Sequence, residues 1–543
     1  MKTFGALLRQ RLRRDRWQLI IWVLCIGLLG AFSATSIDST YGNPAGRAEL
    51  MHLAIANPAI LVLRGLPQGT SLAAVTFFEI YTFLALLAGL MSTFLAVRHT
   101  RAEEESGRAE LVAATEAARI TPTVATIVHG LIANVLVAVA VALGFISTGL
   151  PAYGSFVAGA AVGGAGIAFL AVGLFTSQLM STSRGANGLA AAIVVLAYFL
   201  RGIGDSIGTL KPDGVHMVSA WPSWLSPIGW GEQTDAYDAD VWWPLLLDLA
   251  FATVVIAVVF VLQSQRDTDA SLLAERSGRA DARPALNGPL GLAWRLQWPT
   301  VLGWAAGGAA TGALAGALGS VVSSSIANDP TLAAMRKTLA SIGGGASGSM
   351  TQIFISAIFA IVGVLAAACA TQVVVRLRQE EAGGTAELML ATPLSRIRWL
   401  LEFLLVGVIA VVIVLAAAGL ASGLSAIAAG ETSSMIGNSL AAAAAQLPVA
   451  FIYLGVLALV FVVLPNWSIV IAWATLGLGA FVGIFGAFVG IPDWIHQLSP
   501  FTHTPVVTGS SPDWSGGIWM LAIAIVATLA AAALIRRRDF AIA

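Results

Sequence analysis

The stretch RAEEESGRAELVAAT, Arg101–Thr115, lies between two long apolar runs and returns 277 residues later as RQEEAGGTAELMLAT, Arg378–Thr392. The two stretches share nine identities in fifteen positions, and Arg119 and Arg396 follow them in the same register. Further landmarks recur at similar offsets: Asn57-Pro58 with Arg64 and Asp329-Pro330 with Arg336, Leu225-Ser226-Pro227 and Leu498-Ser499-Pro500, and Arg266-Asp267 and Arg538-Asp539. Self-similarity at a fixed period indicates that one structural unit is encoded twice.

The composition favours a membrane protein. Of the 543 residues, 57% are hydrophobic and only 11% are charged, which is far more apolar than a soluble domain. Lysine plus arginine equals aspartate plus glutamate at 29 each, so no net charge favours a nucleic acid partner. The two cysteines, Cys25 and Cys369, lie in apolar runs and indicate neither a disulfide framework nor a thiolate metal site.

Runs of about 18 or more apolar residues are typical of membrane-spanning helices. The chain holds twelve such runs, at 18–36, 73–97, 122–148, 155–178, 187–203, 242–263, 298–320, 351–375, 398–421, 438–464, 467–490 and 516–535. We therefore predict an all-α polytopic membrane protein with two six-helix halves, 1–264 and 292–543, joined by a cytoplasmic linker, 265–291. Because each half has an even number of helices, the halves form a parallel pseudo-twofold repeat.

The distribution of basic residues predicts the orientation. With the amino and carboxyl termini in the cytoplasm, 23 of the 29 lysines and arginines lie on the cytoplasmic side of this topology. The positive-inside rule predicts that asymmetry.

The repeated acidic segment joins the second helix of each half to the third on the cytoplasmic side. Helix-forming residues around one glycine predict a short amphipathic helix along the membrane surface. A solvated loop with charge pairs would be the plainer interpretation of a single copy. Because the carboxylates recur at matching positions, we favour two equivalent partner proteins, one docked on each half. The carboxylates expected to point to water or to a partner are Glu103, Glu104, Glu110, Glu380, Glu381 and Glu387.

At these residues the chain resembles the ABC-2 type transporter permeases, and within them the fused twelve-helix permeases of polyketide-antibiotic and multidrug exporters of the tetronasin type. The resemblance covers nearly the whole chain. It rests on the basic start LLRQRLRRDRW, the two R-x-E-E segments, the stretches LSPIGW and LSPFTH, and the RD that ends each sixth helix. It implies a bacterial inner-membrane protein whose acidic segments are coupling helices, each seated in a groove of a separate ATP-hydrolysing subunit.

The resemblance also implies roles for individual residues. The ATPase-coupling positions are Arg101, Glu103, Glu104, Gly107, Glu110, Arg378, Glu380, Glu381, Gly384 and Glu387. The basic start would be an elbow helix that touches the same subunit, with Arg9, Arg13, Arg14 and Arg16. The two copies depart from each other where Arg108 stands opposite Thr385 and Glu105 opposite Ala382.

The sequence contains no G-x-x-x-x-G-K-[ST] phosphate-binding motif. The chain is therefore expected to be no enzyme by itself and to hold no cofactor, metal or catalytic residue. ATP and Mg would be bound by two copies of a separate ABC ATPase subunit.

Glu79 is the candidate substrate-binding residue of the second span. A charged carboxylate at membrane depth is costly, and such residues are usually functional. The alternative is that Glu79 pairs with Arg64. Its repeat position is Ser356. For His129, Asn134 and Glu402, packing or snorkelling is the favoured interpretation.

In the family, the substrate pathway runs between the halves, along the first, second and fifth helices of each. The aromatic residues of those helices are Trp22, Phe32, Phe78, Tyr81, Phe83, Tyr198, Phe199, Phe354, Phe359, Phe481, Phe485 and Phe488. An apolar, aromatic lining favours lipophilic substrates and broad selectivity. For any single aromatic, core or lipid packing is the alternative.

The leading hypothesis is thus the membrane subunit of an ATP-driven exporter of lipophilic drugs, antibiotics or lipids. One alternative is a proton-driven secondary drug transporter, against which the small number of ionisable residues at membrane depth counts. Another is a membrane module that does not transport.

Overall fold

The structure is a computed structural model, and contacts divide it into two compact units, Met1–Gly278 (unit 1) and Arg279–Ala543 (unit 2). It describes residues 2–115, 117–266, 271–273, 284, 288–327, 349–485, 492–507 and 512–538. The predicted residue Phe488, the landmarks Asp329, Pro330, Arg336 and Asp539, and most of the predicted linker lie outside the described residues.

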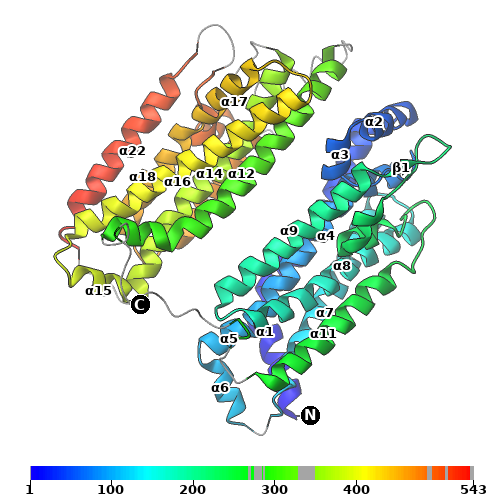
Figure 1. The fold of residues 1–543 in the computed structure, drawn as a ribbon, viewed down its shortest axis with the longest axis horizontal. Coiled ribbons are helices and arrows are strands. Elements are labelled where there is room, and N and C mark those ends of the chain that lie inside the picture. Colours follow the sequence, from blue (N-terminus) through cyan, green and yellow to red (C-terminus); the bar gives the residue numbers. More distant parts are fainter. Residues whose placement is uncertain are drawn as a thin grey trace. The chain divides into compact units, whose positions relative to one another are not determined.

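Unit 1 contains six long helices: α1 (Lys2–Tyr41), α4 (Leu72–Arg98), α7 (Thr121–Ser147), α8 (Ala152–Leu179), α9 (Ser183–Ser206) and α11 (Leu245–Gln265). Helix α8 lies at the centre and packs on α4, α7 and α11 (Figure 1). Glycines on α8 bring its backbone close to α7, as expected for small residues between membrane helices. A Cβ at Gly163 would lie 2.9 Å from the Cβ of Ala138.

Short elements connect the long helices of unit 1. They are α2 (Pro44–Ala56), α3 (Pro58–Leu63), α5 (Arg101–Glu105), α6 (Arg108–Ala113), β1 (Thr209–Leu210), β2 (Met217–Val218), a 3-10 turn (Trp221–Leu225) and α10 (Pro227–Glu232). Strands β1 and β2 form an antiparallel hairpin in which Thr209 is opposite Val218. Prolines at the starts of α2 and α10 suit the first helical turn, which lacks backbone acceptors.

Unit 2 is also helical. Its elements are α12 (Pro289–Ala327), α14 (Met350–Ala382), α15 (Thr385–Leu390), α16 (Arg396–Ala428), α17 (Ser434–Ala444), α18 (Leu447–Val463), α19 (Ser468–Ala480), a π-helical turn (Phe481–Phe485), α21 (Asp493–His496), a 3-10 turn (Pro500–His503) and α22 (Ser515–Leu534). Gly308, Gly312 and Gly316 form a small-residue stripe on α12 that lies against α16. A Cβ at Gly312 would lie 2.1 Å from the carbonyl oxygen of Ala418.

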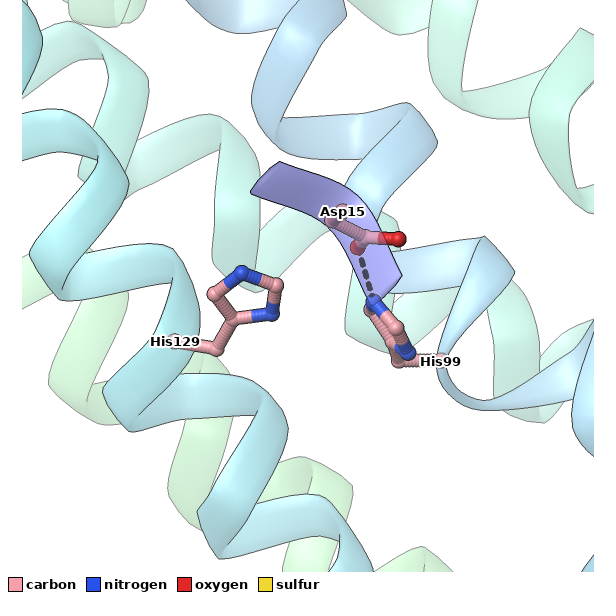
Figure 2. A group of neighbouring side chains, drawn as sticks. All are labelled: Asp15, His99 and His129. Atoms are coloured by element: carbon pink, nitrogen blue, oxygen red, sulfur yellow. Dashed lines mark hydrogen bonds and ion pairs between the residues drawn. The ribbon is translucent and has the colours of Figure 1, made fainter. Parts of the chain in front are cut away.

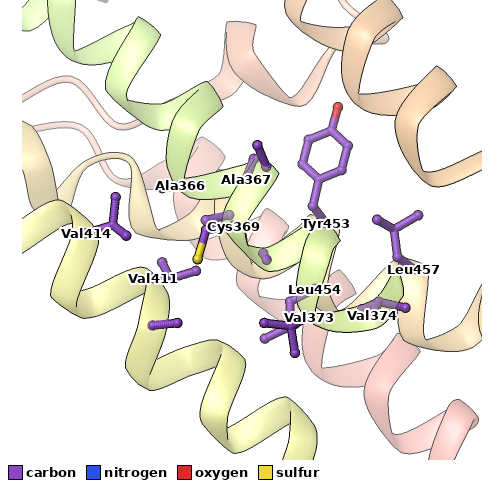
Figure 3. Packing of buried hydrophobic residues seen from close by; sticks show 14 of the residues in the cluster. Ala366, Ala367, Cys369, Val373, Val374, Val411, Val414, Tyr453, Leu454 and Leu457 are labelled. Atoms are coloured by element: carbon purple, nitrogen blue, oxygen red, sulfur yellow. The ribbon is translucent and has the colours of Figure 1, made fainter. Parts of the chain in front are cut away.

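The core of unit 2 gathers around α14. Cys369 of α14, Val411 of α16 and Leu454 of α18 belong to one cluster of buried apolar side chains (Figure 3). The thiol of Cys369 is therefore a packing group.

The all-α polytopic fold class is confirmed. Among the described residues, eleven helices are long and apolar enough to cross a membrane, and Ser468–Ile484 is a shorter apolar helix. This shorter helix occupies the predicted span 467–490, whose end lies partly outside the described residues. The twelfth span and the paired six-helix halves remain predictions.

The basic start does not form a helix of its own. Helix α1 runs without a break from Lys2 to Tyr41, so the basic start and the first span are one element. The reason is local: Leu7–Trp17 contains neither glycine nor proline and is rich in arginine and leucine, which are good helix formers.

Candidate functional site: two matched helical corners

The two copies of the acidic segment fold into the same backbone shape. In the first corner, Arg101–Thr115, α5 is followed by Gly107 at φ +71° and then by α6. In the second corner, Arg378–Thr392, the end of α14 is followed by Gly384 at φ +72° and then by α15. A Cβ would meet no atom within 4 Å at either glycine. The left-handed backbone, and not crowding, therefore explains the glycine at both places.

Gly107→Ala and Gly384→Ala are each expected to destabilise their corner by about 1–2 kcal/mol, the cost of placing an L-residue in the left-handed region. Limited proteolysis of the purified chain should show faster cleavage at the altered corner. Gly107→Asn and Gly384→Asn are matched controls, because asparagine tolerates this conformation better, and they should be cleaved more slowly than the alanine variants. Equal cleavage of all variants and wild type would refute the argument.

One glutamate of each corner is bound by two arginines of its own unit. Glu104 accepts from Arg101 at 2.8 Å and also pairs with Arg266, which directly follows α11. In unit 2, Glu381 lies 3.5 Å from Arg378 and pairs with Arg538, shortly after α22. The side chain of Glu104 is 17% exposed and that of Glu381 is 1% exposed. These two carboxylates hold the corner to the last helix of the unit.

A second contact made by an arginine also occurs at both corners. The guanidinium of Arg119, just before α7, donates to the carbonyl oxygen of Arg266. The guanidinium of Arg396, at the start of α16, donates to the carbonyl oxygen of Arg538. The sequence shows these four arginines as repeat landmarks: Arg119 with Arg396, and Arg266 with Arg538. Their contact partners become evident only in the fold.

A second glutamate of each corner, Glu103 or Glu380, binds a residue on the far side of the left-handed glycine in the same corner. Glu103 accepts from Arg108 at 2.9 Å and pairs with Arg14 of α1. In the second corner, Glu380 pairs with Arg376, and the hydroxyl of Thr385 donates to the Glu380 carbonyl oxygen at 3.0 Å and to its carboxylate. Arg108 and Thr385 thus occupy the same position and make the same closing contact with different chemistry. The hydrogen bond to Glu103 raises the pKa of the Arg108 guanidinium.

The expectation that all six corner carboxylates point outward is wrong. Glu380 and Glu381 are buried, and Glu103 and Glu104 are half-buried because arginines of the same unit bind them. Only Glu110 and Glu387 of the six are exposed. Each is followed by an exposed leucine: Leu111 is 72% exposed and Leu388 is 74% exposed. We call Glu110 with Leu111, and Glu387 with Leu388, the outer pairs.

The four predicted elbow arginines, Arg9, Arg13, Arg14 and Arg16, are exposed on α1. Arg14 reaches the first corner through Glu103, and Arg16 lies over the ring of Trp17 at 5.6 Å. Sequence reasoning missed Arg11. Its buried guanidinium donates to the carbonyl oxygens of Pro122 at 2.7 Å and His99 at 3.2 Å. Arg11 therefore joins α1 to α4 and α7 at the base of the first corner.

The pairing alternative for Glu79 is confirmed: Glu79 forms an ion pair with Arg64. A second polar cluster lies nearby, because Thr82 donates both to the carbonyl oxygen of Arg64 at 2.7 Å and to Glu232 at 3.1 Å. Glu232 lies 3.4 Å from the fully buried Arg201. Glu79 thus has a structural partner, and its contact with substrate remains a prediction.

The predicted aromatic lining divides into core and surface. Phe78, Tyr81, Tyr198 and Phe359 are buried in their own units, and the hydroxyl of Tyr81 donates to the carbonyl oxygen of Ile228 at 2.9 Å. Trp22, Phe83, Phe199 and Phe354 are half-buried, while Phe32 and Phe481 are exposed. Phe485 ends the π-helical turn. For the buried four, core packing accounts for the position.

Unit 2 also has an apolar cavity that the sequence did not reveal. It measures about 440 Å³ and lies between α18, α19 and the Leu498-Ser499-Pro500 turn. Leu457, Val460 and Leu478 contribute to its lining. Such a lining suits a lipophilic molecule.

Long apolar helices and a helical corner that occurs once in each unit define an all-α polytopic membrane protein. The family model "Multidrug efflux system permease Rv1217c, C-terminal domain" matches residues 286–536. The multidrug efflux system permease protein Rv1217c of Mycobacterium tuberculosis (strain ATCC 25618 / H37Rv) is 34% identical over 544 residues, covering 99% of this chain and 95% of that protein. The chain belongs to this family of multidrug efflux system permeases.

Proposed function

We propose that the chain is the membrane-spanning permease subunit of an ATP-driven exporter of the ABC class. Two copies of a separate ATPase subunit bind ATP and Mg and dock on the two corners, one copy on each. The protein lies in the inner membrane of a bacterial cell with both termini in the cytoplasm. ATP-driven closure of the ATPase pair moves the corners, and the permease releases a lipophilic compound outward.

The observation that carries this proposal is the construction of the same corner twice. Each corner has a left-handed glycine, a glutamate tied to the last helix of its unit, and an exposed outer pair. Each corner is fixed to the long helices on one side and exposed on the other. Such a corner can transmit the movement of a bound partner to the membrane helices. Exposed leucines beside carboxylates supply the apolar and charged contacts that protein interfaces combine.

The substrate class rests on a different observation. The cavity of about 440 Å³ in unit 2 is lined almost entirely by apolar side chains. Binding there would proceed by desolvation with few directional contacts, which permits chemically varied lipophilic substrates. The name of the relative from Mycobacterium tuberculosis, a multidrug efflux system permease, agrees with this class.

One feature favours the proton-driven alternative. Asp248 of α11 is fully buried, and neither of its carboxylate oxygens has a hydrogen-bond partner among the described residues. Buried carboxylates of this kind carry protons in secondary transporters. Most other buried carboxylates of unit 1 are ion-paired, as Asp205 is with Arg201 at 3.3 Å, which favours the ATP-driven proposal.

Co-purification and reconstitution distinguish the two mechanisms. The chain, extracted in mild detergent, is expected to bring with it two copies per permease of a polypeptide that carries the G-x-x-x-x-G-K-[ST] motif. Vesicles holding both proteins should export a lipophilic fluorescent dye with ATP, and an ionophore that collapses the proton gradient should have no effect. Vesicles with an Asp248→Asn permease are the control and should transport like wild type. Dye transport by the permease alone, driven by an imposed pH gradient, would refute the proposal.

A further inference from the structure

Three ionisable side chains from three helices meet in the interior of unit 1. They are Asp15 of α1, His99 directly after α4, and His129 of α7 (Figure 2). One potential ligand atom from each lies within 4.8 Å of the other two. Asp15 and His99 are 2% exposed, and His129 is fully buried. Nε2 of His99 and a carboxylate oxygen of Asp15 form a hydrogen bond.

His129 is the unexplained member of this cluster. Neither of its ring nitrogens has a hydrogen-bond partner among the described residues. A buried polar group without a partner is costly, and most buried polar groups in proteins have one. The ring of His129 lies beside that of His99, with the centroids 5.1 Å apart and the planes tilted by 58°. A ring nitrogen of His129 thus faces the Asp15–His99 pair with no assigned role.

The cluster is confined to unit 1 although the chain is duplicated. At the offset of 277 residues that aligns the corners, His99 corresponds to Arg376 and His129 to Val406. Aligning Trp17 with Trp298 places Leu296 opposite Asp15. None of the three positions of unit 2 keeps a ligand, so the corner that both units share does not require the cluster.

We propose that Asp15, His99 and His129 form a binding site for a divalent transition-metal ion of the zinc class. Two imidazoles and one carboxylate are ligands that zinc accepts, with bonds of about 2.0–2.2 Å. In a tetrahedral site such bonds place the ligand atoms about 3.4 Å apart. The hydrogen-bonded oxygen of Asp15 and Nε2 of His99 are closer than that and would have to separate, while a nitrogen of His129 lies within 4.8 Å of both. Rotations of the three side chains would supply these adjustments.

The surroundings set the properties of this site. Arg98 lies 3.2 Å from the Oδ1 atom of Asp15 and leaves the other oxygen to face His99. The positive charges of Arg98 and Arg11 weaken the attraction for a cation, so a moderate affinity is expected. A cavity of about 280 Å³, lined in part by His99, Arg11 and Arg14, reaches one member of the cluster, and it is the approach that the proposal assigns to the ion.

Occupation of the site would tie α1, α4 and α7 together next to the first corner, because His99 precedes Arg101 by two residues. This inference does not depend on the ATP-driven mechanism. It concerns binding to the chain itself and is tested without transport.

The test uses the full chain, purified without a histidine tag and stripped of metal with a chelator. We expect wild type to bind one Co²⁺ per chain with visible absorption bands typical of tetrahedral coordination, and Zn²⁺ to displace it. Zn²⁺ should raise the Tm of wild type in proportion to the logarithm of its concentration. His129→Leu should abolish both effects, and Asp15→Asn should weaken binding at least tenfold.

His129→Leu is also the test of folding. Because the ring of His129 has no polar partner, an apolar side chain of similar size should leave the Tm in chelator unchanged or raise it. His52→Leu, at an exposed histidine of α2, is the matched control and should bind metal like wild type. Absence of saturable Co²⁺ binding by wild type, or equal binding by His129→Leu, would overturn the proposal.

Discussion

The double substitution Leu111→Arg and Leu388→Arg is expected to abolish drug-stimulated ATP hydrolysis by the reconstituted complex, with a loss of tenfold or more. Both leucines are more than 70% exposed within unit 1 or unit 2, so the change should leave the fold of the chain intact. If the two outer pairs insert into a partner, however, two arginines must be buried there. Truncation of a central interface residue alone costs about 2 kcal/mol or more, which corresponds to roughly thirtyfold in affinity.

The single variants make this test sharper. Leu111→Arg or Leu388→Arg alone should leave one ATPase copy bound, so that the co-purified ratio falls from two per permease to one. Leu210→Arg on β1 is the matched control, since Leu210 is 48% exposed and lies outside both corners. Wild-type hydrolysis and an unchanged ratio in the double variant would exclude docking at the outer pairs.

Glu381→Ala is expected to destabilise the protein by about 3–5 kcal/mol, the cost of leaving buried charges without their partner. The side chain of Glu381 is 1% exposed and neutralises Arg378 and Arg538 together. Glu104→Ala removes the corresponding carboxylate of unit 1, but at 17% exposure water can solvate part of the remaining charge, so a smaller loss is expected. The midpoint of thermal unfolding in detergent measures both.

Glu387→Ala serves as the control for this prediction, because it changes an exposed glutamate of the same corner. Exposed substitutions of that kind usually alter the free energy of unfolding by less than about 0.5 kcal/mol. If Glu381→Ala unfolds at the same temperature as Glu387→Ala, the ion pairs with Arg378 and Arg538 do not stabilise the fold.

Local chemistry in the sequence was sufficient to predict the long helices. In each acidic segment it predicted one short amphipathic helix, where the structure has helical pieces on either side of a left-handed glycine. Apolar runs predict helices because a membrane-spanning helix needs about 20 such residues. The left-handed backbone of the glycine between the helix formers became evident only in the fold. The repeat added the correspondence between Gly107 and Gly384. It also marked Arg266 and Arg538 as notable, although it could not say what they bind.

The ion pairs and the polar cluster could not be predicted from the sequence, because they depend on contacts between segments far apart in the chain. Glu104 and Arg266 are 162 residues apart, and no pattern in either segment predicts their ion pair. The cluster of Asp15, His99 and His129 has the same character, because each residue comes from a different helix. The continuous α1 was missed for another reason: the family resemblance implied a separate elbow helix before the first span, whereas the helix propensity of the basic start provides no boundary there.

Because Arg108 and Thr385 make different contacts in the two corners, the corners are expected to respond differently to salt. Glu103 is held by Arg14 and Arg108, whose side chains are 39% and 48% exposed, so dissolved ions reach and screen this attachment. Glu380 is sheltered and is held partly by the neutral hydroxyl of Thr385, which ions do not screen. Rising salt is therefore expected to weaken the closing contact of the first corner more than that of the second, so that the two corners differ in how firmly they hold their shape as ionic strength changes.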